Sequence, residues 1–258
     1  MNETDWPDYL ISRAIAQPPQ DCFVVRGSTP VVAFGDPVRS SVATLGINPS
    51  SKEFLNRKGV LLEGDKRRLA TLQSLETENR GSLDTEDGKA ILNDCAEYFH
   101  NSPYQWFKPL NRVLSEGIGA SYGSTACHLD LAQWATDPVW RDLDLTVRMK
   151  LLDDGVGFLV NQLEREQYRL VLVNGRTVMK EVESAGITSW KSVGSALSDP
   201  TTDLYVGDSG NQRFLGWSCN LQSQPGARRH IGALINFVKE FAGFSPLAAA
   251  TNNNGVKS

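Results

Sequence analysis

Residues 41–51 have the sequence Ser-Val-Ala-Thr-Leu-Gly-Ile-Asn-Pro-Ser-Ser. The β-branched and apolar positions predict a short buried strand that ends at Gly46, and a polar turn follows it. In an α/β sheet, ligands bind at the carboxyl ends of the strands. Pro49 restricts the conformation of Asn48, so this amide is held at the mouth of the sheet, where it can bind a water or a substrate oxygen. Gly46 lets another group come close to the backbone. The alternative is an ordinary strand-to-loop turn.

Strand and helix patterns alternate along the chain. The predicted strands cover residues 31–34, 41–45, 126–131, 170–173, 204–206 and 214–221. The predicted helices cover residues 65–75, 90–99, 106–115, 147–162, 177–184 and 228–241, and residues 76–89 form a charged surface loop. This order favours a three-layer α/β/α fold with a mostly parallel central sheet. A turn at Gly35-Asp36-Pro37 joins the first two strands into an antiparallel edge hairpin.

Length and composition predict one domain with a sizeable core. The chain has 258 residues, 40% of them hydrophobic, and we expect the domain to span residues 1–245 and a disordered polar tail to span 246–258. Trp106, Phe107 and Trp134 are predicted core residues. No apolar run approaches the roughly 20 residues that cross a bilayer, and the acidic N-terminus lacks the order of a signal peptide. We therefore expect a cytoplasmic monomer that does not bind membranes.

Cysteine and histidine usage argues against a metal site. The four cysteines include no Cys-x-x-Cys pair, and no two of the three histidines have helical metal-ligand spacing. We expect no metal, no cofactor and no disulfide framework. The net charge of −4 gives no general support to nucleic-acid binding, although a local basic patch can coexist with an acidic back face.

Three segments, in this order, resemble the uracil-DNA glycosylase superfamily. Gly46-Ile47-Asn48-Pro49 is similar to the first catalytic motif, in the Gly-x-Asn-Pro form of the mismatch-specific, thymine-DNA and single-strand-selective branches. Residues 127–134 are similar to the strand that supplies the base-reading amide. Residues 216–230 occupy the place of the second motif, in which a loop enters the minor groove. The resemblance covers the chain from about residue 31 to residue 241.

The resemblance implies a monofunctional glycosylase, which turns a base out of the stack and hydrolyses its bond to deoxyribose. Asn48 is then the catalytic residue, because its amide positions water under a sugar of oxocarbenium character. An amide is a weak base, so we expect a slow enzyme. Ile47 and Phe54 are implied base contacts, with core packing as the alternative for Phe54. Ser50 and Ser51 bind the adjacent phosphate or cap the next element.

Asp130 departs from the pattern of the uracil enzymes, in which the matching residue is typically Asn. An ionised Asp only accepts hydrogen bonds, and carboxylates pair with the 4-amino group of cytosine. Asp130 therefore favours a cytosine-like base over uracil. The alternative is a carboxylate that accepts backbone N–H bonds or pairs with a nearby arginine. His128 shares a strand face with Asp130, as a base contact or as a structural histidine.

The second-motif region supplies the implied DNA contacts. Pro225 and Gly226 form the wedge loop, and a basic run at the start of the last helix suits phosphate or is simply solvated. The full set of implied DNA-binding residues here is Gln222, Ser223, Gln224, Pro225, Gly226, Arg228, Arg229 and His230.

These roles together predict a DNA glycosylase that acts on a cytosine the host does not carry. Hypermodified phage cytosines fit this description, including glucosylated hydroxymethylcytosine, and a known anti-phage glycosylase of the superfamily acts on such bases. Three alternatives stay open: repair of uracil or mismatched thymine, a catalytically silent nucleic-acid binding module on the same fold, and a hydrolase of free nucleosides.

Overall fold

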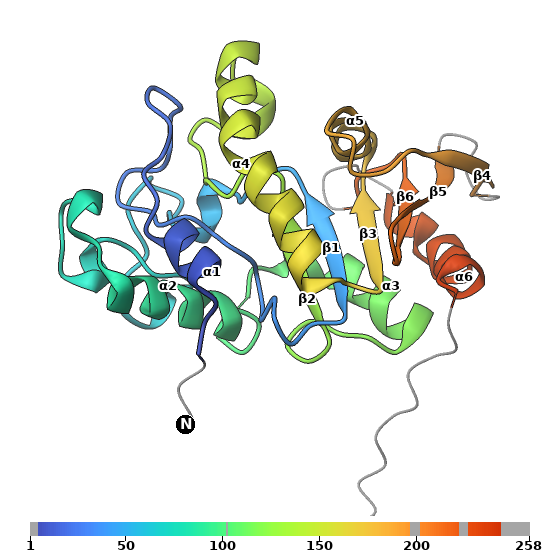
Figure 1. Cartoon of the computed structure of the whole chain (residues 1–258), viewed down its shortest axis with the longest axis horizontal. Helices are drawn as coiled ribbons and strands as arrows, with labels where there is room; N and C mark the ends of the chain where they lie inside the picture. Colours follow the sequence, from blue (N-terminus) through green and yellow to red (C-terminus); the bar gives the residue numbers. More distant parts are fainter. Residues whose placement is uncertain (1–4, 102, 197–201, 222–226, 244–258) are drawn as a thin grey trace, which may run out of the picture.

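The central sheet has six strands in the order β2-β1-β3-β6-β5-β4 (Figure 1). The computed structural model describes residues 5–101, 103–196, 202–221 and 227–243, so the predicted tail at 246–258 lies outside the described residues. The strands are β1 Val42–Gly46, β2 Ala126–Asp130, β3 Leu170–Asn174, β4 Lys191–Ser195, β5 Asp203–Ser209 and β6 Gln212–Trp217. β2, β1, β3 and β6 run parallel, whereas β5 and β4 add an antiparallel edge. The predicted α/β class is confirmed.

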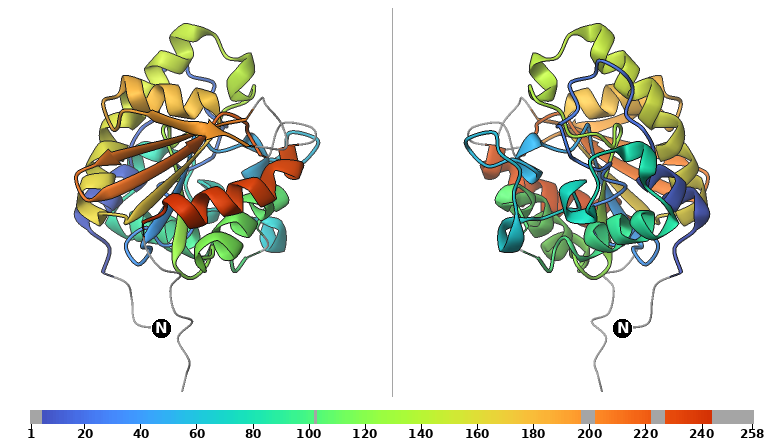
Figure 2. Two further views of the ribbon diagram at one scale, coloured as in Figure 1. Left: turned by 90° about the vertical axis from the view of Figure 1, so that its right-hand side faces the viewer. Right: turned by 90° about the vertical axis from the view of Figure 1, so that its left-hand side faces the viewer.

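Helices cover both faces of the sheet (Figure 2). The α-helices are α1 Asp8–Ala14, α2 Thr85–Glu97, α3 Lys108–Ile118, α4 Leu145–Glu166, α5 Arg176–Ser184 and α6 Ile231–Phe241. Short 3-10 helices span η1 Ser51–Glu53, η2 Gly64–Lys66, η3 Gln73–Leu75, η4 Arg80–Ser82, η5 Gln105–Phe107, η6 Trp140–Asp142 and η7 Ala227–His230. α3 and α6 pack on one face, and α4 and α5 pack on the other.

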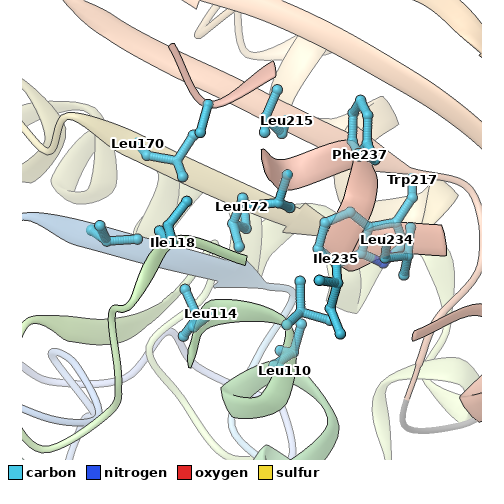
Figure 3. Packing of buried hydrophobic residues seen from close by; sticks show 14 of the residues in the cluster. Leu110, Leu114, Ile118, Leu170, Leu172, Leu215, Trp217, Leu234, Ile235 and Phe237 are labelled. Carbon is cyan, nitrogen blue, oxygen red and sulfur yellow. The ribbon is translucent and has the colours of Figure 1, made fainter. Parts of the chain in front are cut away.

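The central strand β3 shows why the sheet needs both helical layers. Leu170 and Leu172 pack with α3 and α6, and Figure 3 shows Leu172 among the leucines of this cluster. The alternate residues Val171 and Val173 pack with α4 and α5. Successive side chains of a strand point to opposite faces, so an uninterrupted apolar strand requires cover on both sides.

The position of the antiparallel edge differs from the sequence prediction. Residues 31–34 are buried but form no strand, and Phe34 alone exchanges two backbone hydrogen bonds of 2.8 Å with His128 of β2. The predicted hairpin with residues 41–45 is wrong because both edges of β1 are already paired with the parallel strands β2 and β3. The antiparallel edge is formed instead by β5 and the unpredicted strand β4.

The predicted helix at residues 65–75 is also wrong. Only the short η2 and η3 occur there, because local side-chain bonds compete with a helix. Thr71 and Ser74 exchange backbone-to-hydroxyl bonds of 2.9 and 3.1 Å. The predicted surface loop at 76–89 gives way to α2 from Thr85, where a capping box of Asp84 and Asp87 starts the helix.

The end of β1 is a topological switch point. The chain leaves β1 toward α3, on one face of the sheet, and leaves the neighbouring strands β2 and β3 toward α4 and α5 on the other face. The arrows of β1 and β3 point the same way in Figure 1, so their carboxyl ends share one edge. Ligands of open α/β sheets bind in the crevice that such diverging connections leave.

Candidate functional site

Asn48 lies two residues beyond β1, and its side-chain amide is fixed in one orientation. Nδ2 donates to the carbonyl oxygen of Trp134 and to Oγ1 of Thr136, each at 3.2 Å. A carbonyl oxygen only accepts, so the atom that faces Trp134 must be the nitrogen. A bridge between Ser50 and Thr136 holds the turn in place. The amide carbonyl oxygen, Oδ1, is therefore presented to a donor such as water or a substrate group.

Asp130 and His128 lie together above the backbone of Gly46. A Cβ atom on Gly46 would come within 2.5 Å of Asp130 Oδ1 and within 2.8 Å of His128 Nε2. The prediction that Gly46 admits a close group is thus confirmed, and the group is this pair. Both side chains are buried, and His128 Nε2 is 3.5 Å from Asp130 Oδ1.

A hydrogen-bonded chain orients the His128 ring. The Tyr122 hydroxyl is 2.6 Å from Thr44 Oγ1, which is 2.7 Å from His128 Nδ1. Burial raises the pKa of Tyr122, so its phenol keeps a proton and takes part in this chain as a neutral hydroxyl. The chain orients the His128 ring, whose Nε2 lies 3.5 Å from Asp130 Oδ1. The other carboxylate oxygen of Asp130 can accept from a ligand.

Aromatic rings surround the His128 imidazole. The ring centroids of Phe34, Trp106 and Phe107 lie 5.8, 5.5 and 5.1 Å from it. Phe107 is in the core as predicted, whereas Trp106 keeps part of its surface exposed. The Arg68 guanidinium lies 5.4 Å from the ring of the partly exposed Tyr104. Tyr104 and Trp106 therefore give this side of the site flat surfaces that a base could stack against.

Glu53 is a buried carboxyl that the sequence did not reveal. It is 3% exposed and accepts a 2.7 Å hydrogen bond from the Tyr98 hydroxyl. The pKa of Glu53 is raised to about 7: burial is the main cause, Tyr98 and Arg68 act against it, and the charge of Asp130 adds to it. No periodic pattern marks this position, because Glu53 is the last residue of the single turn η1 in a polar stretch.

The other residues of the first motif have structural contacts. The Ile47 carbonyl oxygen accepts from the Ala132 amide at 2.9 Å. Phe54 is 1% exposed in a hydrophobic cluster, which agrees with its core alternative. Ser50 caps η1 by accepting from the Lys52 amide at 3.3 Å, and Ser51 is the first residue of that turn. The capping alternative therefore describes Ser50, whereas Ser51 lies inside the turn and its two alternatives stay open.

The second-motif residues are only partly described. Gln222, Ser223, Gln224, Pro225 and Gly226 lie outside the described residues. Arg228 belongs to η7, and the structure describes only its backbone. Arg229 is exposed, whereas His230 is buried at the start of α6. A phosphate at the surface could therefore meet Arg229 but not His230.

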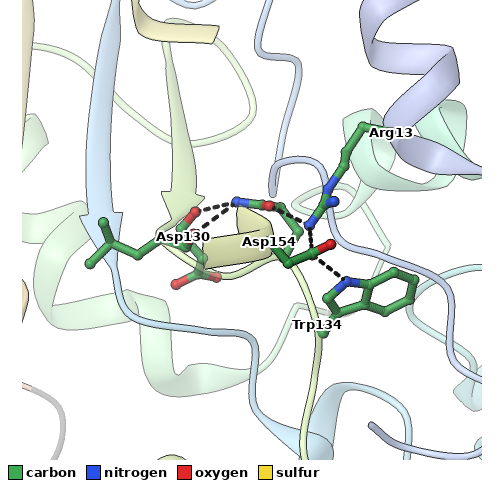
Figure 4. Close-up of polar contacts among 6 residues, drawn as sticks. Arg13, Asp130, Trp134 and Asp154 are labelled. Carbon is green, nitrogen blue, oxygen red and sulfur yellow. Dashed lines mark hydrogen bonds and ion pairs between the residues drawn. The ribbon is translucent and has the colours of Figure 1, made fainter. Parts of the chain in front are cut away.

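A polar network fixes the loop that follows β2 (Figure 4). Arg13 of α1 donates to Asp154 of α4 at 2.6 Å and to Gln133 at 2.8 Å. Asp154 also accepts from the Trp134 indole at 3.0 Å, and Gln133 donates to the Asp130 carbonyl at 2.6 Å. Two helices thereby hold the backbone that carries Asp130 and the Trp134 carbonyl, the acceptor of Asn48.

Two pockets open in the described surface near these elements. One, of about 330 Å³, is lined by Asp65, Arg67, Arg68, Asp94, His100 and Asn101. The other is a groove of about 1140 Å³ between residues 23–27, 55–61 and 72–80, with Asp137 at its side. Neither pocket is lined by Asn48 or Asp130. We place the candidate site at the strand ends nevertheless, because the oriented amide and the buried pair are there.

Comparison with protein-family models and with curated proteins gives no significant match. The resemblance to the uracil-DNA glycosylase superfamily therefore stays a prediction. No helix in the described part of the chain has the length and hydrophobicity needed to cross a bilayer. Over the same residues, no three His, Cys, Asp or Glu side chains gather as a metal site requires.

Proposed function

We propose that this protein is a monofunctional DNA glycosylase that hydrolyses the bond between a flipped-out base and its deoxyribose. The observation that carries the proposal is the orientation of Asn48 at the switch point. Its Nδ2 is held by Trp134 and Thr136, so Oδ1 can hold a water below the anomeric carbon. As the C1′–N bond breaks, its electron pair leaves with the base and the water oxygen bonds to C1′. The water proton passes to the base or to solvent, which is compatible with a weak base at Asn48.

Asp130 directs the proposal toward a cytosine-like base. One oxygen lies 3.5 Å from Nε2 of His128, and the second can accept from a 4-amino group. Uracil presents a carbonyl oxygen at that place, and two facing acceptors would cost about 1–3 kcal/mol. A host cannot tolerate removal of ordinary cytosine, so the proposed substrate is a modified cytosine of foreign DNA, met in the cytoplasm.

The test is base release from matched oligonucleotides that carry uracil, cytosine, 5-hydroxymethylcytosine or glucosylated hydroxymethylcytosine. Alkali converts the abasic product into a strand break that a gel resolves. We expect cleavage only at a modified cytosine. Asn48→Ala should lower the rate at least about 100-fold, since it removes the group that positions water. The matched control is Asn236→Ala, at an exposed amide on α6.

The pattern of cleavage separates the alternatives. Asp130→Asn should shift activity toward uracil, because an amide can donate to the uracil carbonyl. Cleavage of uracil by the wild-type protein would keep the glycosylase and reject the role given to Asp130. DNA binding without abasic sites on any substrate would favour the silent binding module, an alternative that the overall charge of −4 does not especially support.

A further inference from the structure

The turn that carries Asn48 leads into a basic segment, residues 52–68. Six lysines and arginines stand in it against three carboxylic acids, although the whole chain has a net charge of −4. The basic members are Lys52, Arg57, Lys58, Lys66, Arg67 and Arg68. Positive charge is therefore concentrated in the chain directly after the proposed catalytic residue, where it attracts phosphate groups.

Arg68 is the basic residue that contacts the turn itself. Its Nη1 donates to the carbonyl oxygen of Lys52 at 2.7 Å, and its guanidinium carbon lies over the ring of Tyr104, 5.4 Å from the centroid. Arg68 makes no further hydrogen bond with another residue that the structure describes, so its Nε and Nη2 groups can donate to a ligand. A guanidinium next to an aromatic ring can bind the phosphate and the base of one nucleotide.

A polar pocket of about 330 Å³ lies beside Arg68 and gives a phosphate room. His100 and Asn101 share its lining, and their side chains can donate hydrogen bonds. Arg67 is paired with the Asp94 carboxylate, whereas Arg68 makes no ion pair with a described residue. Arg68 is therefore the cation of this pocket that an incoming anion can neutralise.

Hydrogen bonds fasten Tyr104 to the same turn. The Tyr104 amide donates to the Tyr98 hydroxyl at 3.0 Å, and this hydroxyl donates to the Glu53 carboxylate of η1 at 2.7 Å. Tyr98 and Glu53 are both buried, whereas Tyr104 keeps part of its surface exposed. The exposed ring is thus held by buried groups, so little entropy is lost when a base stacks on it.

Tyr104 also lies next to the residues that would read the target base. The Trp106 ring centroid is 5.5 Å from that of His128, and His128 Nε2 is 3.5 Å from Asp130 Oδ1. Tyr104 precedes Trp106 by two residues, and two residues of chain span at most about 7 Å. The exposed surface of Tyr104 is therefore close to the candidate site, on the side of Trp106.

We propose that Tyr104 and Arg68 form a subsite for the nucleotide next to the target, with its base against the Tyr104 ring and its phosphate on Arg68. This inference rests on the proposed glycosylase function and adds a second nucleotide to the substrate. The target base itself would lie at Asn48 and Asp130. Because every base has a face that can stack, the subsite adds affinity for the strand without selecting a sequence.

The test is a binding cycle on single-stranded oligonucleotides with a central 5-hydroxymethylcytosine. The nucleotide on its 5′ or its 3′ side is either intact or a tetrahydrofuran residue, which lacks the base. Fluorescence anisotropy gives Kd in the Asn48→Ala background, in which we expect little turnover. Loss of the neighbouring base on one side should raise Kd at least about fivefold, the size of one lost stack. With Tyr104→Ala the same loss should have no effect, and Tyr104→Phe, which keeps the ring, should restore it.

The phosphate contact is tested by the salt dependence of the same Kd. Arg68→Ala should reduce the slope of log Kd against log salt concentration by about 0.7, the value for one phosphate of a single strand. Arg68→Lys keeps the charge and should keep the slope. The control Lys239→Ala removes an exposed cation near the C-terminal end of α6 and should change neither the slope nor the effect of the missing base.

Three results would overturn the subsite. The first is an equal effect of the missing base with and without the Tyr104 ring, because a merely structural role of Tyr104 weakens binding of both oligonucleotides alike. The second is an unchanged salt slope in Arg68→Ala, and the third is no binding of either oligonucleotide. These results are independent of base release. Release without the Tyr104 effect keeps the glycosylase and rejects the subsite, whereas the Tyr104 and Arg68 effects without release by the wild-type protein reject the glycosylase and keep the subsite.

Discussion

At Gly46, the absence of a side chain lets two buried polar groups lie over the end of β1. Asp130 and His128 project from the neighbouring strand at positions paired with Gly46 and Thr44. Because the sheet leaves no room for any Cβ atom at this point, the geometry of the candidate site depends on this residue as much as on the polar residues themselves.

Gly46→Ala should therefore destabilise the protein by about 1–3 kcal/mol, because the new methyl group overlaps the Asp130 carboxylate and the His128 ring. Urea unfolding gives the free energy. Gly157→Ala is the matched control, since that glycine lies on α4 with no atom near its Cβ position, and Ala there should stabilise the helix by about 0.5–1 kcal/mol. Equal stability of Gly46→Ala and wild type would show that the pair moves aside at no cost.

The residues predicted from sequence share one signal. Asn48, His128 and Asp130 follow or end apolar strands, and strand alternation places the last two on one face. Glu53 and Trp106 have no such signal, because they lie on single turns whose burial is decided by distant residues. The sequence allowed two roles for Ser50, a cap or a phosphate ligand, and two for Phe54, a core ring or a base contact. Only tertiary contacts distinguish the two roles of each residue.

At the scale of elements, α1 and α4 hold the loop after β2 through a buried ion pair. The side chains of Arg13 and Asp154 are 8% and 23% exposed, and Arg13 also lies 5.8 Å from the Trp134 ring. The next residue of α4, Gly155, has no room for a Cβ atom beside the Leu131 carbonyl. The helix thereby approaches the loop closely enough for Asp154 to reach both Arg13 and Trp134.

Asp154→Ala should cost about 3 kcal/mol of stability, because it leaves the Arg13 guanidinium buried without its carboxylate. Chemical denaturation monitored by tryptophan fluorescence provides the measurement. Glu116→Ala is the control: it breaks the exposed Arg112–Glu116 pair, with side chains 60% and 48% exposed, and should cost less than about 1 kcal/mol. If Asp154→Ala and Glu116→Ala lose the same small amount of stability, the polar network around Arg13 and Asp154 does not hold the loop after β2.

Element prediction succeeded where local pattern and packing agree. The apolar runs at β2 and β3 and the amphipathic α4 needed no distant partner to be recognised. It failed at residues 31–34, whose apolar sequence is equally suited to a strand or to a buried extended segment. The sequence around residues 65–75 has helical residues, but Thr71 and Ser74 bond to each other's backbone instead. Such competition depends on a few hydrogen bonds that propensity does not contain.

For the whole molecule, the class of fold was predictable and the strand order was not. Alternating strands and helices require a sheet between two helical layers. The order β2-β1-β3-β6-β5-β4, however, is set by contacts between segments far apart in sequence, and it decides that the end of β1 is the switch point. To predict a ligand at Asn48, it was enough to recognise the end of a strand in the sequence. That Asn48 and Asp130 lie at the same end of the sheet follows only from the parallel pairing of β1 with β2.

Glu53 makes the stability of the whole molecule depend on pH. Its pKa is about 7 in the folded protein against an ordinary value of 4.5, so between these values the native state holds a proton that the unfolded state has released. Stability then falls as pH rises through this window, by as much as about 3 kcal/mol at about 1.4 kcal/mol per pKa unit. Below pH 4.5 both states are protonated and Glu53 contributes no slope.

Glu53→Gln should remove this fall, because a neutral amide can still accept from Tyr98 and has no charge to keep out of water. Urea unfolding at pH 5 and at pH 8 should show a wild-type protein that is less stable at the higher pH. The variant should lack this Glu53-dependent loss of stability. Its stability relative to the wild type should therefore be higher at pH 8 than at pH 5. Glu164→Gln, at an exposed carboxylate on α4, is the control and should keep the wild-type slope. If Glu53→Gln also keeps the wild-type dependence of stability on pH, then Glu53 is ionised in the folded protein at pH 5. In that case the effects of Tyr98 and Arg68 on its pKa outweigh the effect of burial.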